Sequence, residues 1–166
     1  MFPVGSAIVK AYLDIETSFL GEITVIGLYA EDRGFVQLVG GGVTDLALWK
    51  ALEGIQVICT YNGSRFDLPV IRRHLRLDLR RAFASHDLMY DCWKRKLYGG
   101  LKRVEEQLDI RRRTRGIDGV EAMRLWHRYE TTHDSRALMT LLEYNREDVL
   151  NLETLDRILQ GKVPCA

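Results

Sequence analysis

Cysteine, long apolar runs and an excess of charge are scarce or missing in this 166-residue sequence. Its three cysteines, Cys59, Cys92 and Cys165, have neither the spacing of zinc ligands nor the pattern of a disulfide framework. No apolar run approaches the roughly 20 residues that cross a bilayer. The first residues also lack the basic and apolar regions of a signal peptide. We therefore expect a cytoplasmic protein without a membrane partner.

Several catalytic signatures are also missing. The four histidines lie far apart in the sequence, and no GxxxxGK[ST] loop is present, so histidine–metal chemistry and nucleotide triphosphate hydrolysis have no support. The net charge of +1 neither requires nor excludes a nucleic-acid partner. The basic residues are nevertheless clustered, with five arginines and one acid over 72–81 and four arginines over 111–115. Such stretches around an acidic centre would suit a polyanion, although a solvated helix face explains each one equally well.

The order of predicted elements indicates a mixed sheet covered by helices. Strands predicted over 6–17, 22–31 and 34–39 are joined by short turns and should form an antiparallel meander. A helix over 45–53, capped by Thr44 or Asp45, leads to a buried strand over 55–60 that can lie parallel to the first. The remaining predictions are helices over 68–77, 89–97, 101–109, 118–130 and about 134–159, a short strand over 85–88 and a basic loop over 111–117. We expect one α/β domain over residues 1–166, with a five-stranded sheet (three antiparallel strands, then parallel ones) and helices on both faces.

Two carboxylates share one face of the first predicted strand. Residues two apart on a strand point the same way, so Asp14 and Glu16 lie together while Leu13 and Ile15 point into the core. Neighbouring carboxylates repel each other unless a cation lies between them, and their hard oxygen atoms suit Mg²⁺ or Mn²⁺. The alternative is an exposed strand face that happens to be acidic.

Two later segments carry further polar candidates. Asn62, Phe66 and Asp67 follow the buried strand directly, where α/β sheets tend to carry their sites. Asp67 could equally cap the next helix, and Asn62 could be a turn residue. Tyr144 and Asp148 are four residues apart on the last predicted helix and therefore share a face. A surface aspartate beside a core tyrosine is the alternative there.

Taken in order, these three segments resemble the three exonuclease motifs of the DEDD superfamily. That family's first motif has an Asp and a Glu two apart, as Asp14 and Glu16 are, and its second has an Asn followed by a Phe-Asp pair. Its third has a Tyr or His before its Asp, and Tyr144 stands four residues before Asp148. The sequence therefore resembles the tyrosine branch, which includes the proofreading domains of family B DNA polymerases. Residues 100–105 and 144–149 are similar to the narrower YprB-like, ribonuclease H-like group, and the likeness spans about residues 8–158.

The resemblance implies a 3′→5′ exonuclease that hydrolyses phosphodiester bonds at a DNA or RNA 3′ end with two Mg²⁺ or Mn²⁺ ions. Single-stranded DNA is favoured over RNA. It implies that the four carboxylates bind metal and that Tyr144 orients the attacking water. Asn62 and Phe66 would contact the substrate strand. The loop arginines would contact its phosphates, and they are Arg111, Arg112, Arg113 and Arg115.

Two other functions compete with this interpretation. One is a catalytically silent nucleic-acid-binding module with the same fold. Such a module would usually have lost an acidic ligand, and all four are present. The other is a structure-specific endonuclease, which would also cut a closed circular strand. A helicase or a polymerase is a candidate partner, and no oligomeric state is predicted.

Overall fold

The computed structural model describes residues 8–162, in which five strands form one sheet with the order β3-β2-β1-β4-β5. The strands are β1 (Lys10–Thr17), β2 (Ile23–Ala30), β3 (Gly34–Val39), β4 (Val57–Thr60) and β5 (Ala84–Asp87). The first three pair antiparallel, whereas β4 lies parallel to both β1 and β5. The predicted mixed sheet is therefore confirmed. The predicted start of the first strand, at residues 6 and 7, lies outside the described residues.

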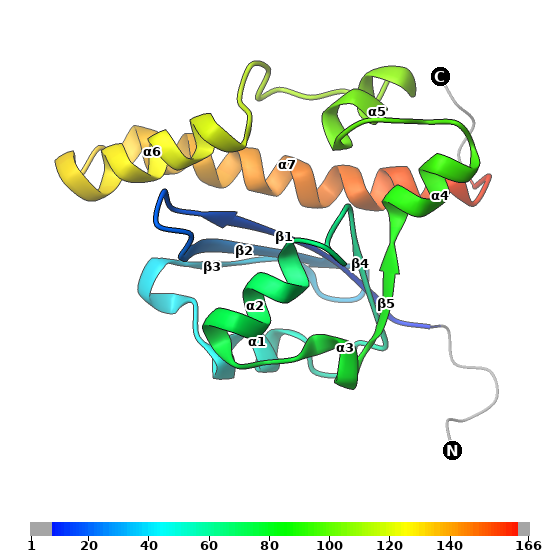
Figure 1. The fold of residues 1–166 in the computed structure, drawn as a ribbon, viewed down its shortest axis with the longest axis horizontal. Coiled ribbons are helices and arrows are strands. Elements are labelled where there is room, and N and C mark those ends of the chain that lie inside the picture. The colour runs from blue at the N-terminus through cyan, green and yellow to red at the C-terminus, as the bar shows by residue number, and fades with distance from the viewer. Residues whose placement is uncertain (1–7, 163–166) are drawn as a thin grey trace.

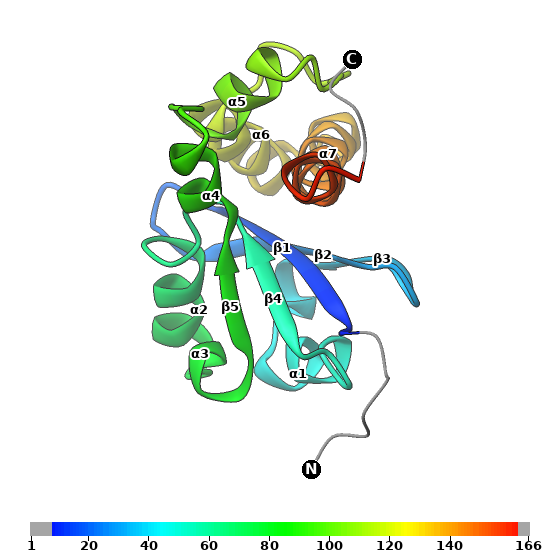
Figure 2. The same ribbon diagram turned by 90° about the vertical axis from the view of Figure 1, so that its right-hand side faces the viewer.

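Helices cover both faces of this sheet, as Figures 1 and 2 show. One face carries α1 (Asp45–Ala51), α2 (Asp67–Leu75) and α3 (Leu79–Ala82), and the other carries α4 (Leu88–Lys94), α5 (Leu101–Gln107), α6 (Gly119–Thr132) and α7 (Ser135–Leu159). Helix α3 and the 3₁₀ turn η1 (Gly40–Gly42) were not predicted, because each is too short for a repeating helical pattern to appear in the sequence. Within the described range, none of the helices combines the length and apolar character that crossing a bilayer requires.

The alternation along β1 divides its side chains between two cores. Leu13 and Ile15 pack with Leu68 and Ile71 of α2, on one face of the sheet. Tyr12 packs on the other face, against side chains of α4 and α7. The even-numbered residues of β1, Asp14 and Glu16 among them, therefore face the layer that contains α7.

Helix α7 approaches the sheet very closely at Gly27 of β2, which pairs with Asp14 in the neighbouring strand. A Cβ atom at Gly27 would lie 2.8 Å from Val149 Cγ2 and 3.0 Å from Asn145 Cγ. Both distances are well below ordinary van der Waals contact, so only glycine leaves room for the helix here. The missing side chain thus brings the middle of α7 against the centre of the sheet.

Candidate metal centre and active site

Three carboxylates converge where α7 crosses β1. Asp14 and Glu16 come from β1 and Asp148 comes from α7, and oxygen atoms of the three lie within 4.8 Å of one another. Glu16 and Asp148 are buried, whereas Asp14 is half-buried. The shared strand face predicted for Asp14 and Glu16 is present, but α7 covers much of it, and only Asp14 remains partly exposed.

The electrostatics of this carboxylate cluster are unfavourable without a cation. Burial, and then the negative charge of Asp148, raise the pKa of Asp14 and of Glu16 well above the usual range. Two cationic side chains, Lys102 and Arg112, pair with Asp148. Among residues 8–162, neither Asp14 nor Glu16 forms an ion pair. A buried set of repelling oxygen donors fits a hard divalent cation such as Mg²⁺ or Mn²⁺.

Asp67 lies beside the carboxylate cluster and is tied to β1. It is the first residue of α2, and its Oδ1 accepts a hydrogen bond of 3.1 Å from the Ile15 backbone N–H, between the two acidic residues of β1. The N-cap position belongs to Phe66, so Asp67 does not have the capping role that the sequence left open. Burial raises the pKa of Asp67 to about 7, although the hydrogen bonds from backbone N–H groups lower it in part.

A buried asparagine, Asn145, links α7 to Asp14. Its Nδ2 donates to Asp14 Oδ2 at 3.0 Å, and its Oδ1 accepts from Gln37 Nε2 at 2.9 Å. Asn145 is fully buried, so these bonds fix the position of the Asp14 carboxylate. No role was predicted for Asn145 from the sequence. The signal available was a polar amide on the helix face that also carries Leu141, Leu142 and Val149.

Tyr144 and Lys102 form a second polar contact at the site. Tyr144 is buried, and its hydroxyl accepts a hydrogen bond of 2.6 Å from Lys102 Nζ, which also lies 3.7 Å from Asp148 Oδ2. Burial, followed by the nearby carboxylates, raises the pKa of the Tyr144 phenol. The phenol is therefore neutral and cannot act as a general base. The helix that carries Lys102 was predicted, and Lys102 lies in the 100–105 segment that carries the YprB-like resemblance, but no role at the site was predicted for it.

Arg112 is buried between two carboxylates, in contrast to its neighbours in the loop. Its Nε and Nη2 donate to Glu105 at 2.8 and 2.7 Å, and Nη2 also donates to Asp148. The sequence prediction of an Arg112 that faces substrate phosphate does not fit this arrangement, because the guanidinium is already paired with buried carboxylates. Its neighbours Arg111, Arg113 and Arg115 are exposed, as the predicted basic loop requires.

The loop between β4 and α2 is organised by the buried Asp87. Its Oδ1 accepts from the Asn62 backbone N–H at 2.7 Å, and its Oδ2 accepts from the Ser64 hydroxyl at 2.6 Å. Asn62 has a left-handed backbone with φ of 60°, which asparagine tolerates better than most residues. This supports the turn role that the sequence left open for Asn62. Phe66, next to Asp67, is 44% exposed and free to meet a ligand.

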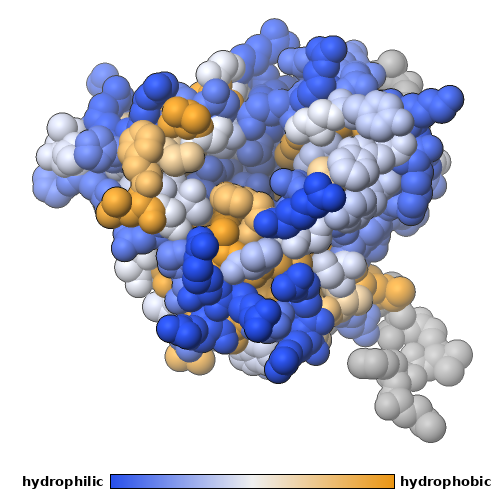
Figure 3. Space-filling model, viewed as in Figure 1, coloured by the Kyte–Doolittle hydropathy of each residue, from blue (hydrophilic) through white to orange (hydrophobic). Residues whose placement is uncertain are grey.

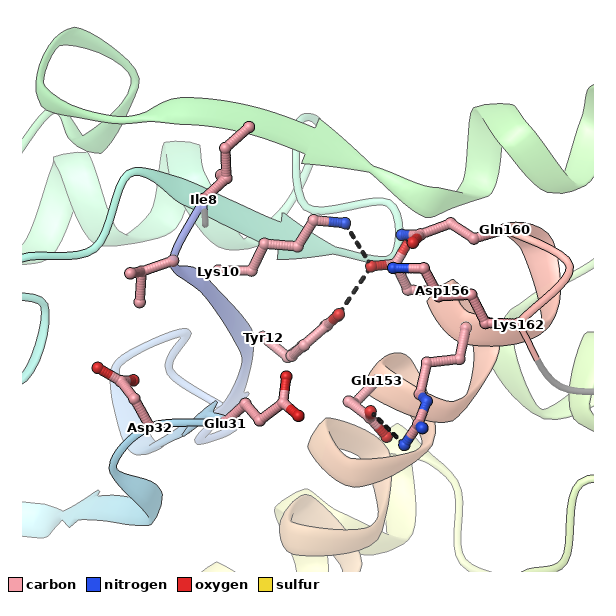
Figure 4. Close-up of a pocket in the computed structure, with 11 residues that line it drawn as sticks. Ile8, Lys10, Tyr12, Glu31, Asp32, Glu153, Asp156, Gln160 and Lys162 are labelled. Atoms are coloured by element: carbon pink, nitrogen blue, oxygen red, sulfur yellow. Dashed lines mark hydrogen bonds and ion pairs between the residues drawn. The ribbon is translucent and has the colours of Figure 1, made fainter. Parts of the chain in front are cut away.

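A separate cavity of about 640 Å³ lies between the beginning of β1 and the end of α7. Figure 4 shows Lys10 and Tyr12 pointing towards the buried Asp156, with distances of 2.6 and 2.7 Å to its Oδ2. Gln160 Nε2 donates to the other oxygen, Oδ1, at 2.6 Å. The polar groups at the centre of this cavity thus bind one another and hold β1 against α7.

Comparison with known proteins agrees with the fold. Residues 11–160 match the profile of the RNase_H superfamily, and the chain belongs to that superfamily. A solved structure of the family B DNA polymerase from the hyperthermophilic archaeon Pyrobaculum calidifontis superposes with a TM-score of 0.75 and 16% sequence identity. The match covers 96% of this chain and 25% of the polymerase chain, so this chain spans about a quarter of that protein. A search of curated protein sequences gives no match.

Proposed function

We propose that this chain is a metal-dependent 3′→5′ exonuclease of the DEDD tyrosine branch, with single-stranded DNA preferred over RNA. The observation that carries the proposal is the convergence of Asp14, Glu16 and Asp148, with Tyr144 one helical turn before Asp148. The resemblance of the three sequence motifs and the structural likeness to a family B DNA polymerase support the same reaction. RNase H-like proteins use divalent metals for phosphodiester hydrolysis, and the donor set here suits them.

Each side chain of the site has a defined task in this proposal. Asp14, Glu16 and Asp148, with Asp67 beside them, would hold two Mg²⁺ or Mn²⁺ ions, which polarise the phosphate and activate a water when bound. The neutral Tyr144 hydroxyl orients the attacking water and does not accept its proton.

The surrounding residues position these groups and the substrate. Lys102 holds the Tyr144 hydroxyl and adds positive charge near the phosphate. Arg112 is held by the buried Glu105 and donates a hydrogen bond to Asp148, which fixes the position of the Asp148 carboxylate. The exposed ring of Phe66 offers a surface on which a terminal base can stack.

The basic loop after α5 would contact the phosphates of the incoming strand. Glu147, one residue before Asp148, accepts hydrogen bonds from the backbone N–H groups of Arg113 and Thr114, at 2.6 and 2.8 Å. The loop is thereby attached to the helix that carries the metal ligand. The side chains available for phosphate are those of Arg111, Arg113 and Arg115, which are exposed.

The test is degradation of a 5′-labelled single-stranded DNA and its RNA counterpart with Mg²⁺ or Mn²⁺, and again with EDTA. We expect a metal-dependent ladder that shortens from the 3′ end and is faster for DNA. Asp14→Asn should abolish it, whereas Asp32→Asn, at the exposed turn between β2 and β3, should not. A near-wild-type rate for Asp14→Asn would contradict the assignment. Cutting of a closed circular strand would favour the endonuclease, and metal binding without any cleavage would favour the silent module.

A further inference from the structure

The outer surface of α2 and α3 concentrates positive charge away from the carboxylate cluster. Arg72 and Arg73 of α2, Arg76 at its C-terminal cap and Arg80 of α3 line one shallow hollow together with Pro69. All four arginines are exposed. Figure 3 shows strongly hydrophilic side chains gathered over the position of α2. We call these four residues the α2 arginine surface.

The charge on the α2 arginine surface is largely unneutralised. Asp78 is the one acidic residue between 68 and 81. Its carboxylate lies 3.6 Å from Arg72 Nε and 3.8 Å from Arg80 Nε, and also 3.7 Å from the neighbouring Arg81 Nε, so one negative charge is shared by three guanidinium groups. Within residues 8–162, no carboxylate pairs with Arg73 or Arg76. Exposed guanidinium groups held close together with so little counter-charge are suited to a polyanion.

The position of α2 relates this surface to the carboxylate cluster. The helix begins at Asp67, whose carboxylate accepts the hydrogen bond from the Ile15 backbone N–H between Asp14 and Glu16. From there α2 runs away from the carboxylate cluster (Figure 1). Arg73 and Arg76 follow six and nine residues later, which corresponds to roughly 9 and 13 Å along a helix axis. One strand of nucleic acid advances about 3.4 Å per nucleotide along a helical axis, so this span equals roughly three to four nucleotides.

We propose that the α2 arginine surface binds the phosphate backbone of the substrate strand, three or more nucleotides from the bond that is cut. The inference rests on the proposed function for the identity of the polymer. Arg73 and Arg76 contribute most, because the other two arginines already share Asp78. The surface therefore favours strands long enough to reach from the carboxylates to the far end of α2.

The experiment measures binding of labelled single-stranded DNA in EDTA, so that no cleavage is needed. The variant is Arg73→Gln with Arg76→Gln, compared with wild type on a 20-nucleotide strand over a range of salt concentrations. The matched control is Arg33→Gln with Arg157→Gln, which removes two exposed charges from the β2–β3 turn and the end of α7. Each lost phosphate contact should reduce the slope of log K against log salt by about 0.7, so the variant should lose about 1.4. A strand of two nucleotides, measured by competition, is too short to reach Arg73 and should bind the variant and wild type equally.

The outcomes separate this inference from the proposed function. A control slope equal to wild type, together with the reduced slope of the Arg73/Arg76 variant, supports the α2 arginine surface. An unchanged slope in that variant, or equal weakening for the short strand, overturns it even if the wild type degrades DNA. Failure of the wild type to cleave with Mn²⁺ would overturn the exonuclease assignment instead, and the binding comparison would still decide the role of the surface.

Discussion

Replacing Gly27 by alanine should damage both stability and activity, because the added methyl group meets α7. The new Cβ would lie 2.8 Å from Val149 Cγ2, where ordinary contact begins at 3.4 Å, so that methyl must retreat by about 0.6 Å. The Asn145 side chain must move as well. Overpacking of this kind destabilises a protein by about 1–3 kcal/mol. Alanine also makes the unfolded chain less flexible than glycine does, which stabilises the folded state by up to about 1 kcal/mol. We expect a net loss of about 1–2 kcal/mol in the free energy of unfolding.

The same movement should reach the carboxylate cluster. Asn145 holds the Asp14 carboxylate, and Asp148 lies on α7 between Asn145 and Val149. A shift of even a fraction of an ångström would therefore separate Asp148 from Asp14. Because a misplacement of about 1 Å can cost roughly 10²-fold in rate, we expect activity to fall at least about tenfold. Urea unfolding measures the first effect, and the rate of metal-dependent strand degradation measures the second.

Two controls make the steric reasoning refutable. Gly119→Ala, at the start of α6, places a Cβ with no neighbour within 4 Å and should leave the protein unchanged or slightly more stable. In a Val149→Ala background the clash with the Val149 methyl group is gone and only that with Asn145 remains, so Gly27→Ala should cost less than in wild type. An equal cost in both backgrounds, or a fully stable and active Gly27→Ala protein, would refute the explanation.

Three further predictions follow from the site. The pKa of Asp67 is raised to about 7 in the folded protein and is near 4 when unfolded, so in EDTA stability should fall as pH rises from about 4 through about 7. At pH 4 the free energy of unfolding of Asp67→Asn should equal that of wild type. At pH 8 the variant should be more stable than wild type by at least about 1 kcal/mol. Arg112→Gln leaves the buried Glu105 without its guanidinium partner and Asp148 with Lys102 alone, and it should lower the free energy of unfolding in urea by about 3–5 kcal/mol. Adding Glu105→Gln should recover the part of this loss that comes from Glu105. A loss below about 1 kcal/mol for Arg112→Gln would contradict the buried pairing. Tyr144→Phe removes the hydroxyl that Lys102 binds and should lower kcat about tenfold or more. The increase in stability that Mn²⁺ gives should stay unchanged. If the variant loses that increase together with kcat, Tyr144 belongs to the metal site instead.

The sequence by itself determined the local structure and the acidic face of β1. Alternation in Leu13-Asp14-Ile15-Glu16 was enough to direct the carboxylates away from the Leu13 core, because side chains alternate along any strand. The antiparallel meander and the long last helix were likewise predicted, because short turns and a sustained apolar stripe are local signals. These features depend on residues that are close in the sequence.

Only the tertiary structure decided which charged groups meet. Asp14 and Asp148 are brought together by the packing of α7 on β1, and the close approach depends on a glycine in a third element, β2. Arg112 looked like one of four equivalent loop arginines in the sequence, yet it alone turns inwards to Glu105 and Asp148, while its neighbours stay in solvent. Lys102 reaches Tyr144 across 42 positions of sequence. Such pairings are set by distances between elements, and no local pattern encodes those distances.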